Sequence, residues 1–156
     1  MKITTLAIIG LVFALAGCRA AAPVQTPLEI QSIQSREYEQ DKNVVFTSVM
    51  SVFQDLGYTV KSADKDTGLI TAESAAISNP ASKFWGGVST VTQTSATAFI
   101  EEIGKMTMVR LNFVTSMKKS FGQGQTDRQD TPILDPEFYK NAFERIENAI
   151  FIRSGK

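Results

Sequence analysis

The sequence predicts an α+β domain in which a mostly antiparallel sheet of about five strands carries two helices packed on one face. Two stretches with apolar residues at three- and four-residue steps indicate amphipathic helices, one early and one near the C-terminal end. Between them lie stretches of strand character separated by turns that are short enough for antiparallel neighbours. The predicted order is therefore strand, helix, four strands, helix, in a single domain over residues 30–152.

The domain is expected to begin with a strand over IQSIQSREYEQ, residues 30–40, where apolar and polar residues alternate imperfectly. The next element is a helix from Asn43 to Leu56, with Asp41 as its N-cap and apolar side chains along one face. Gly57 stands where a left-handed residue commonly ends a helix. We expect this helix to bury its apolar face against the sheet.

A hairpin should follow, because YTVKSA (58–63) and LITAESA (69–75) flank the turn-rich stretch DKDTG (64–68). The alternate positions of Asp64 and Asp66 also invite a calcium-loop interpretation. However, neither the glycine nor a glutamate stands at the spacing that an EF-hand loop requires. The turn explains these residues, and no metal site is predicted.

Residues 76–94 are rich in Ser, Thr, Gly and Asn, and they are expected to form a flexible insertion. Two strands then follow, SATAFIEEI and MTMVRLNFVTSM, with Gly104 at the turn between them. In the second strand, Val109, Leu111 and Phe113 occupy alternate positions and therefore share one face. That pattern is typical of a sheet with one covered face.

The stretch KKSFGQGQTDRQDT is expected to be a polar loop that leads to the last helix. This helix covers DPEFYKNAFERIENAIF, with Asp135 at the N-cap and Pro136 at the first helical position. Apolar residues from Tyr139 to Ile150 form one stripe along it. It is the strongest helix signal in the chain.

The N-terminal residues have the pattern of a secretory signal: Met1 and Lys2, a mostly apolar run to Ala16, and a small residue at 17. The run is shorter than the roughly 20 apolar residues that a membrane-spanning helix needs. Residues 1–17 are therefore predicted to be a cleaved signal peptide. The following residues, 18–29, contain two prolines and no apolar period, which predicts a flexible tether.

The four residues LAGC, which end at Cys18, resemble the lipobox of bacterial lipoproteins. The resemblance implies that the Cys18 sulfur receives a diacylglyceryl group and that the new N-terminus is acylated, so that the membrane is a partner. No other cofactor is expected. Because Arg19 and not Asp follows Cys18, the sorting habit of Gram-negative lipoproteins implies the periplasmic face of the outer membrane.

Most of the mature domain also resembles a family of small bacterial lipoproteins with no established activity. The resemblance rests on the stretch from REYEQ to TAES (residues 36–74), on VRLNF and on the last helix. The predicted architecture is similar to the helix-grip domains of the outer-membrane assembly lipoprotein BamC. This second similarity concerns architecture alone and carries over no binding residue.

The composition argues against several classes of function. The chain has 16 basic and 16 acidic residues, so it offers no electrostatic footprint for nucleic acid. It has no histidine, and its one cysteine is the predicted lipid site, so only serine with lysine, or a pair of carboxylates, could serve as nucleophile and base. No local arrangement in the sequence resembles an activated nucleophile, although a Ser-Lys pair brought together by the fold stays open. Glu101 and Glu102 are adjacent in a strand and cannot share a face. We expect no enzymatic activity.

Phe84 and Trp85 are the candidate partner contact, because two large rings stand in a stretch of small and polar residues. The competing interpretation is that they cap the open end of the core. Arg36 and Arg110 either pair across the sheet or present a polar binding face. The expected function is a non-catalytic accessory or scaffold subunit of an envelope assembly or secretion complex, with an envelope protein as partner.

The alternative function is periplasmic binding of a lipid or other small apolar ligand between the sheet and the helices. The residues that would line such a cavity are the same ones that a filled core would use. They are Phe46, Val49, Phe53, Phe113, Tyr139, Phe143 and Ile146.

Overall fold

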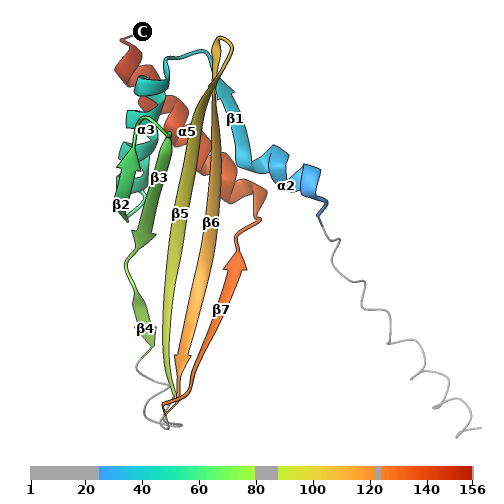
Figure 1. Ribbon diagram of the computed structural model, residues 1–156, viewed down its shortest axis with the longest axis vertical. Helices are drawn as coiled ribbons and strands as arrows, with labels where there is room; N and C mark the ends of the chain where they lie inside the picture. Colours follow the sequence, from blue (N-terminus) through green and yellow to red (C-terminus); the bar gives the residue numbers. More distant parts are fainter. Residues whose placement is uncertain (1–24, 80–87, 122–123, 156) are drawn as a thin grey trace, which may run out of the picture.

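The computed structural model describes residues 25–79, 88–121 and 124–155. It is an α+β domain in which one antiparallel sheet carries its long helices on a single face (Figure 1). The elements in chain order are α2 (Pro27–Gln34), β1 (Ser35–Tyr38), α3 (Lys42–Asp55), β2 (Tyr58–Asp64), β3 (Leu69–Ser74), β4 (Ile77–Asn79), β5 (Ser89–Ile103), β6 (Met106–Ser120), β7 (Thr126–Pro132) and α5 (Pro136–Ser154).

The sheet is organised around one long hairpin, formed by the 15-residue strands β5 and β6. The strand order is β1-β6-β5-β3-β2, while β4 pairs with β5 and β7 pairs with β6 further along the same two strands. Every pairing is antiparallel. The hairpin therefore joins a five-stranded half to a four-stranded half.

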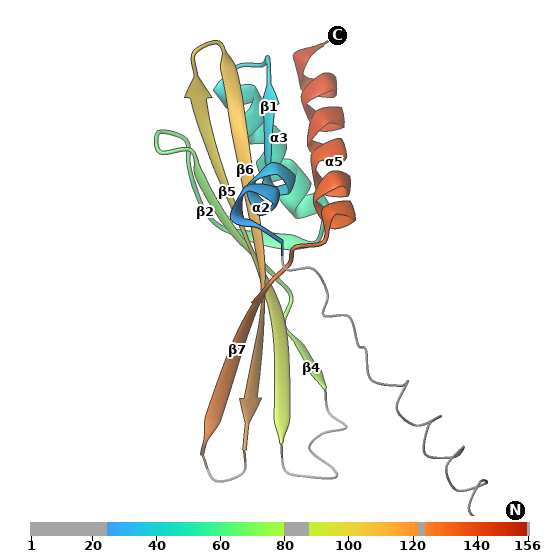
Figure 2. The same cartoon turned by 90° about the vertical axis from the view of Figure 1, so that its right-hand side faces the viewer.

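Helices α3 and α5 pack together on the same face of the five-stranded half, as the sequence predicts (Figure 2). We call this the covered face and the opposite one the open face. Val109, Leu111 and Phe113 are fully buried on the covered face. Their cross-strand partners on β5 are Ile100, Ala98 and Ala96. The small alanines leave room for the helix side chains, so the core forms between these two layers.

The ends of both long helices follow their sequence signals. The Asp41 carboxylate accepts a hydrogen bond from the Asn43 backbone N–H at 2.7 Å, and the Asp135 carboxylate accepts one from Glu137 N–H at 3.0 Å. These bonds satisfy N–H groups that lack partners within a helix. Gly57 follows α3 with φ of 84°, which confirms its expected left-handed conformation.

The predicted strand over residues 30–40 is wrong in its first part. Residues 30–34 belong to helix α2, and only Ser35–Tyr38 form β1. The helix begins inside the stretch predicted as a tether, because Thr26 and Glu29 form a capping box: the Thr26 N–H donates to the Glu29 carboxylate at 2.7 Å. Pro27 at the first helical position supports the same start.

Two other segments contain strands where loops were predicted. The predicted insertion at 76–94 includes β4 and the first residues of β5, and the predicted loop at 118–131 includes the end of β6 and most of β7. Both predictions relied on the lack of an apolar period. In the four-stranded half no helix covers either face, so the strands need no apolar side (Figure 2). The sheet accordingly has seven strands instead of about five.

Candidate functional site

Two sets of candidate residues from the sequence lie outside the described residues. Cys18 lies in the N-terminal segment 1–24, and Phe84 and Trp85 lie within 80–87. Among the residues that the structure describes, no helix is both long and apolar enough to span a bilayer. The same part of the chain contains no cluster of acidic, Cys or His residues that could bind a metal ion.

The seven residues of the alternative ligand cavity are brought together in the core. Each is at most 3% exposed. Phe113 stands at their centre: its ring centroid lies 6.0 Å from that of Phe53 and 5.6 Å from that of Tyr139. Both contacts are edge-to-face, which is a favourable aromatic packing geometry. These residues therefore fill space between the sheet and the helices.

The strongest candidate surface lies in the four-stranded half, which we call the blade. It consists of β4, residues 89–95 of β5, residues 114–120 of β6, and β7. The blade projects beyond the helices, so solvent reaches both of its faces (Figures 1 and 2). All residues of β4 and β7 are exposed, and those of the two central strands are exposed or partly exposed.

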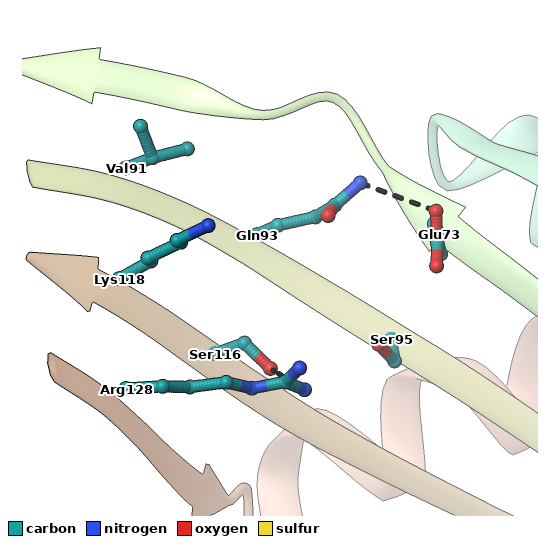
Figure 3. A pocket seen from close by; sticks show the side chains of 7 residues that line it. All are labelled: Glu73, Val91, Gln93, Ser95, Ser116, Lys118 and Arg128. Carbon is teal, nitrogen blue, oxygen red and sulfur yellow. Dashed lines mark hydrogen bonds between the residues drawn. The ribbon is translucent and has the colours of Figure 1, made fainter. Parts of the chain in front are cut away.

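A polar cluster surrounds a depression of about 200 Å³ on the open face of the blade and of the adjoining end of β3 (Figure 3). The antiparallel register builds it, since Val91 lies opposite Lys118, Gln93 opposite Ser116, and Lys118 opposite Arg128. Directly opposed residues in a sheet point to the same face. We call this set the open-face cluster; it contains Glu73, Val91, Gln93, Ser95, Ser116, Lys118 and Arg128.

Hydrogen bonds and ion pairs hold most of the cluster in place. The Gln93 side-chain amide donates to the Glu73 carboxylate at 3.3 Å and to the Ser74 carbonyl at 3.0 Å. Lys61 forms an ion pair with Glu73 at 3.5 Å. These contacts orient the β3 end of the depression. The pair is solvent-exposed, so its contribution to stability is small.

The other end of the cluster is organised by Arg128. Its Nε donates to the Asp130 carboxylate at 3.0 Å. Its Nη2 donates to the Ser116 hydroxyl at 3.3 Å (Figure 3). A hydrogen bond from Ser116 and then one from Arg128 hold the pKa of Asp130 below its usual value. Within the described part of the chain, the Lys118 side chain makes no hydrogen bond or ion pair. Its ammonium group is available to an acidic partner.

A second depression, of about 250 Å³, lies between the end of β1 and the C-terminal end of α5. Its lining includes Tyr38, Ile150 and Phe151. The Tyr38 hydroxyl is buried and has no hydrogen-bond partner among the described residues. Burial raises the pKa of Tyr38 well above its usual value, so this side chain stays neutral across the physiological range.

Arg36 and Arg110 do not pair across the sheet. Arg36 lies opposite Val109 on the covered face, whereas Arg110 lies opposite Ser35 and Phe99 on the open face. The Arg36 guanidinium instead lies over the Phe143 ring. Arg110 is exposed, whereas Arg36 is half-buried.

Comparisons with known proteins give little guidance to function. Neither a known protein family nor a curated protein matches the sequence. Among solved structures, the chain is similar to a DUF4468 family protein from Bacteroides ovatus ATCC 8483, at 9% sequence identity and a TM-score of 0.38. The match covers 85% of this chain and 91% of that one. A similarity this weak carries no information about activity.

Proposed function

We propose that the protein is a lipid-anchored periplasmic lipoprotein of the outer membrane and acts as a non-catalytic accessory or scaffold subunit of an envelope assembly or secretion complex. The anchor would be a diacylglyceryl group and an N-acyl chain on Cys18. The signal-like leader and the LAGC stretch support this part of the proposal. An anchored domain has a raised effective concentration for partners at the same membrane.

The main support for the accessory role is the blade, which projects from the domain and is exposed on both faces. It buries few apolar side chains, so it contributes little to the hydrophobic stability of the domain. However, β5 and β6 continue without a break from the core into the blade, so the buried part of the same two strands anchors the blade to the domain. A projecting polar sheet with two exposed faces is suited to contact with another protein.

The open-face cluster is the part of the blade best prepared for a partner. Arg128 and Gln93 are already held by hydrogen bonds, so less side-chain freedom is lost when a partner binds. Lys118 adds a positive charge that has no internal counter-ion among the described residues. We therefore expect the partner to present carboxylates or carbonyl oxygens to this face.

The non-catalytic part of the proposal is supported by the chemistry of the same cluster. Ser116 accepts a hydrogen bond from Arg128, whose guanidinium stays protonated, and donates one to the Asp130 carboxylate, whose lowered pKa makes it a weak base. The Lys118 ammonium forms no hydrogen bond with a hydroxyl of the described residues. An activated nucleophile needs an adjacent base whose pKa suits proton transfer near neutral pH, and a carboxylate with a lowered pKa does not meet that need.

Site-specific photocrosslinking in intact cells tests the proposal. A photoreactive amino acid replaces Lys118 in the full chain, and a matched control replaces Glu144, an exposed residue on α5. A discrete adduct with another envelope protein from position 118, and none from 144, is expected. Adducts with lipid alone, or equal adducts from both positions, would contradict the accessory role.

The anchor is tested separately with Cys18→Ser in the same chain. We expect the unaltered protein to sediment with outer membranes and the variant to be absent from that fraction. The same distribution for both chains would refute the lipid anchor. It would leave the crosslinking result interpretable, because the blade lies far along the chain from residue 18.

A further inference from the structure

Strand β7 presents an exposed edge of the blade. Among the described residues it pairs with β6 and with no other strand (Figure 1). All seven of its residues are exposed. An unpaired strand edge carries N–H and C=O groups that can pair with another chain. The question is whether the side chains of β7 select a particular partner.

The hydrogen-bond pattern identifies which backbone groups of β7 point outward. The Ile133 N–H donates to the Phe113 carbonyl at 2.9 Å, and the register continues without a shift through the rest of β7. Hydrogen-bonded pairs alternate along antiparallel strands, so residues 127, 129 and 131 bond to β6. Residues 126, 128 and 130 therefore direct their backbone groups away from the sheet.

Pro132 fits this pattern because it occupies an outward position. The N–H that proline lacks would have pointed away from β6, so the internal pairing of β7 loses nothing. The open edge is thus complete at residues 126, 128 and 130, where both the donor and the acceptor are available.

A second copy of β7 can pair with this edge only where outward positions meet outward positions. Three antiparallel registers satisfy this condition and pair most of the strand; they are centred on Arg128, Gln129 or Asp130. The first places Arg128 opposite its own copy, and the third places Asp130 opposite its own copy. Like charges directly opposite one another destabilise a sheet.

The register centred on Gln129 places Arg128 opposite Asp130 of the second copy, and the reverse by symmetry. Within each copy these two side chains already lie on the same face, 3.0 Å apart between Nε and Oδ1. Pairing would therefore create a square of alternating charges on the open face. On the other face, Asp127 would meet Thr131, and Gln129 would meet its own copy, so no like charges are opposed.

We propose that two copies of this chain associate by antiparallel pairing of β7 with β7, about a two-fold axis at Gln129. The two blades then form one continuous sheet with the helices of both copies on the same side. The contact is short, so the dimer is weak in dilute solution. Confinement of both copies to one membrane, if the proposed anchor is present, would favour it.

Disulfide trapping tests the register directly. Across the new contact, Gln129 forms a non-hydrogen-bonded pair with itself, with Cα atoms about 4.5 Å apart. This lies within the range that a disulfide can bridge. The full chain carrying Gln129→Cys is purified in mild detergent, oxidised and analysed on a non-reducing gel; a covalent dimer is expected.

Two matched variants serve as controls. Asp127→Cys and Thr131→Cys each place the thiol roughly 13 Å from its own copy, since about four residues separate them along the strand. Neither should form a dimer alone, but a mixture of the two should. The unaltered chain controls for disulfides through Cys18. No dimer with Gln129→Cys, or equal dimers with every variant, would overturn the proposal.

Charge reversal provides a second readout, the dissociation constant from sedimentation. Arg128→Asp and Asp130→Arg each replace the two opposite-charge contacts with like-charge contacts, and each should raise the constant about tenfold. The chain with both reversals should return close to the original value. A monomer at every concentration, or single reversals without effect, would refute the pairing.

Discussion

The guanidinium carbon of Arg36 lies 5.0 Å from the centroid of the Phe143 ring, so the short edge strand β1 contacts helix α5 through a cation–π interaction. Phe143 is almost fully buried, and Arg36 covers it at the edge of the sheet. This contact helps to fix β1, which pairs only with β6 in the described structure.

Replacing Arg36 with methionine should therefore destabilise the domain. The variant keeps the apolar stem but removes the charge over the ring, and we expect the free energy of unfolding to fall by about 0.5–1 kcal/mol. Arg110→Met is the matched control, because Arg110 is exposed on the open face of the same sheet. Urea unfolding measures the free energy of unfolding of both variants. Equal losses would argue against the cation–π contact.

Gly68→Ala should be far more damaging than Gly57→Ala. Both glycines have positive φ, 77° and 84°, so each substitution pays for a left-handed conformation at about 1–2 kcal/mol. At position 68 the added methyl would also overlap the carbonyl oxygen of Ile100, whereas at 57 it meets no atom within 4 Å. We expect a loss of at least about 3 kcal/mol for Gly68→Ala, measured by urea unfolding.

Equal losses at the two positions would show that the β2–β3 turn can move away from β5. That movement would break the hydrogen bond from the Ile100 N–H to the Gly68 carbonyl, which is 2.9 Å long. Amide exchange at Ile100 in the Gly68→Ala variant distinguishes this relaxation from a retained turn.

Phe113→Ala should cost about 3–5 kcal/mol of unfolding free energy, because it removes a fully buried ring and leaves a cavity. Phe99→Ala is the control: Phe99 lies on the open face of the neighbouring strand and is 41% exposed. The free energy of unfolding should fall clearly less in Phe99→Ala than in Phe113→Ala. Thermal or urea unfolding of the two variants gives the comparison, and similar losses would contradict the assignment of the covered face.

Native mass spectrometry addresses the alternative of an apolar ligand. The seven residues proposed to line a cavity are packed against one another, with ring centroids such as those of Phe53 and Phe113 only 6.0 Å apart. We therefore expect the folded domain to appear at the mass of the bare polypeptide after purification from cells. A reproducible additional mass that disappears on unfolding would instead support ligand binding.

The Asp130 carboxyl should titrate below the ordinary value of about 3.9. The hydrogen bond from Ser116 and then that from Arg128 stabilise the carboxylate, so the pKa of Asp130 is lower in the folded state than in the unfolded state. Its contribution to stability is therefore present above the unfolded pKa and lost as the pH falls through the folded pKa.

Ser116→Ala should raise the pKa of Asp130 toward its ordinary value, as measured by NMR of the carboxyl carbon. Ser95→Ala is the control, since Ser95 lines the same depression on the neighbouring strand. Any stability difference between the Ser116 variant and the unaltered chain should shrink as the solution is acidified. An unchanged titration in Ser116→Ala would show that Arg128 alone sets the pKa.

The sequence was most informative where one face of an element is buried. Helices α3 and α5 combine capping by Asp41 and Asp135 with a single apolar stripe, so local signals and tertiary packing agree. The hairpin of β2 and β3 was predictable for a similar reason, since Gly68 stands at a turn that only glycine fits. By contrast, α2 buries no residue, and its capping box at Thr26 was its only clear signal.

The blade was missed because its strands have no buried side, and period-two patterning arises from burial. Threonine at alternate positions 90, 92 and 94 favours strands, but an exposed loop has similar composition. The open-face cluster was beyond sequence reasoning for a different reason. Glu73, Ser116 and Arg128 come together only through the register of β3, β5, β6 and β7, which no local pattern encodes.

The pairing of β1 with β6 also constrains the order in which the chain can fold. Ser35 lies opposite Arg110, so β1 has no partner strand until most of the chain has been synthesised. Helix α3 and the β2–β3 hairpin involve near neighbours in sequence and can form earlier. Strand β1 is therefore among the last to join the sheet. Until β6 is in place, its backbone groups have no partner strand, and joining the two strands closes a long loop of chain.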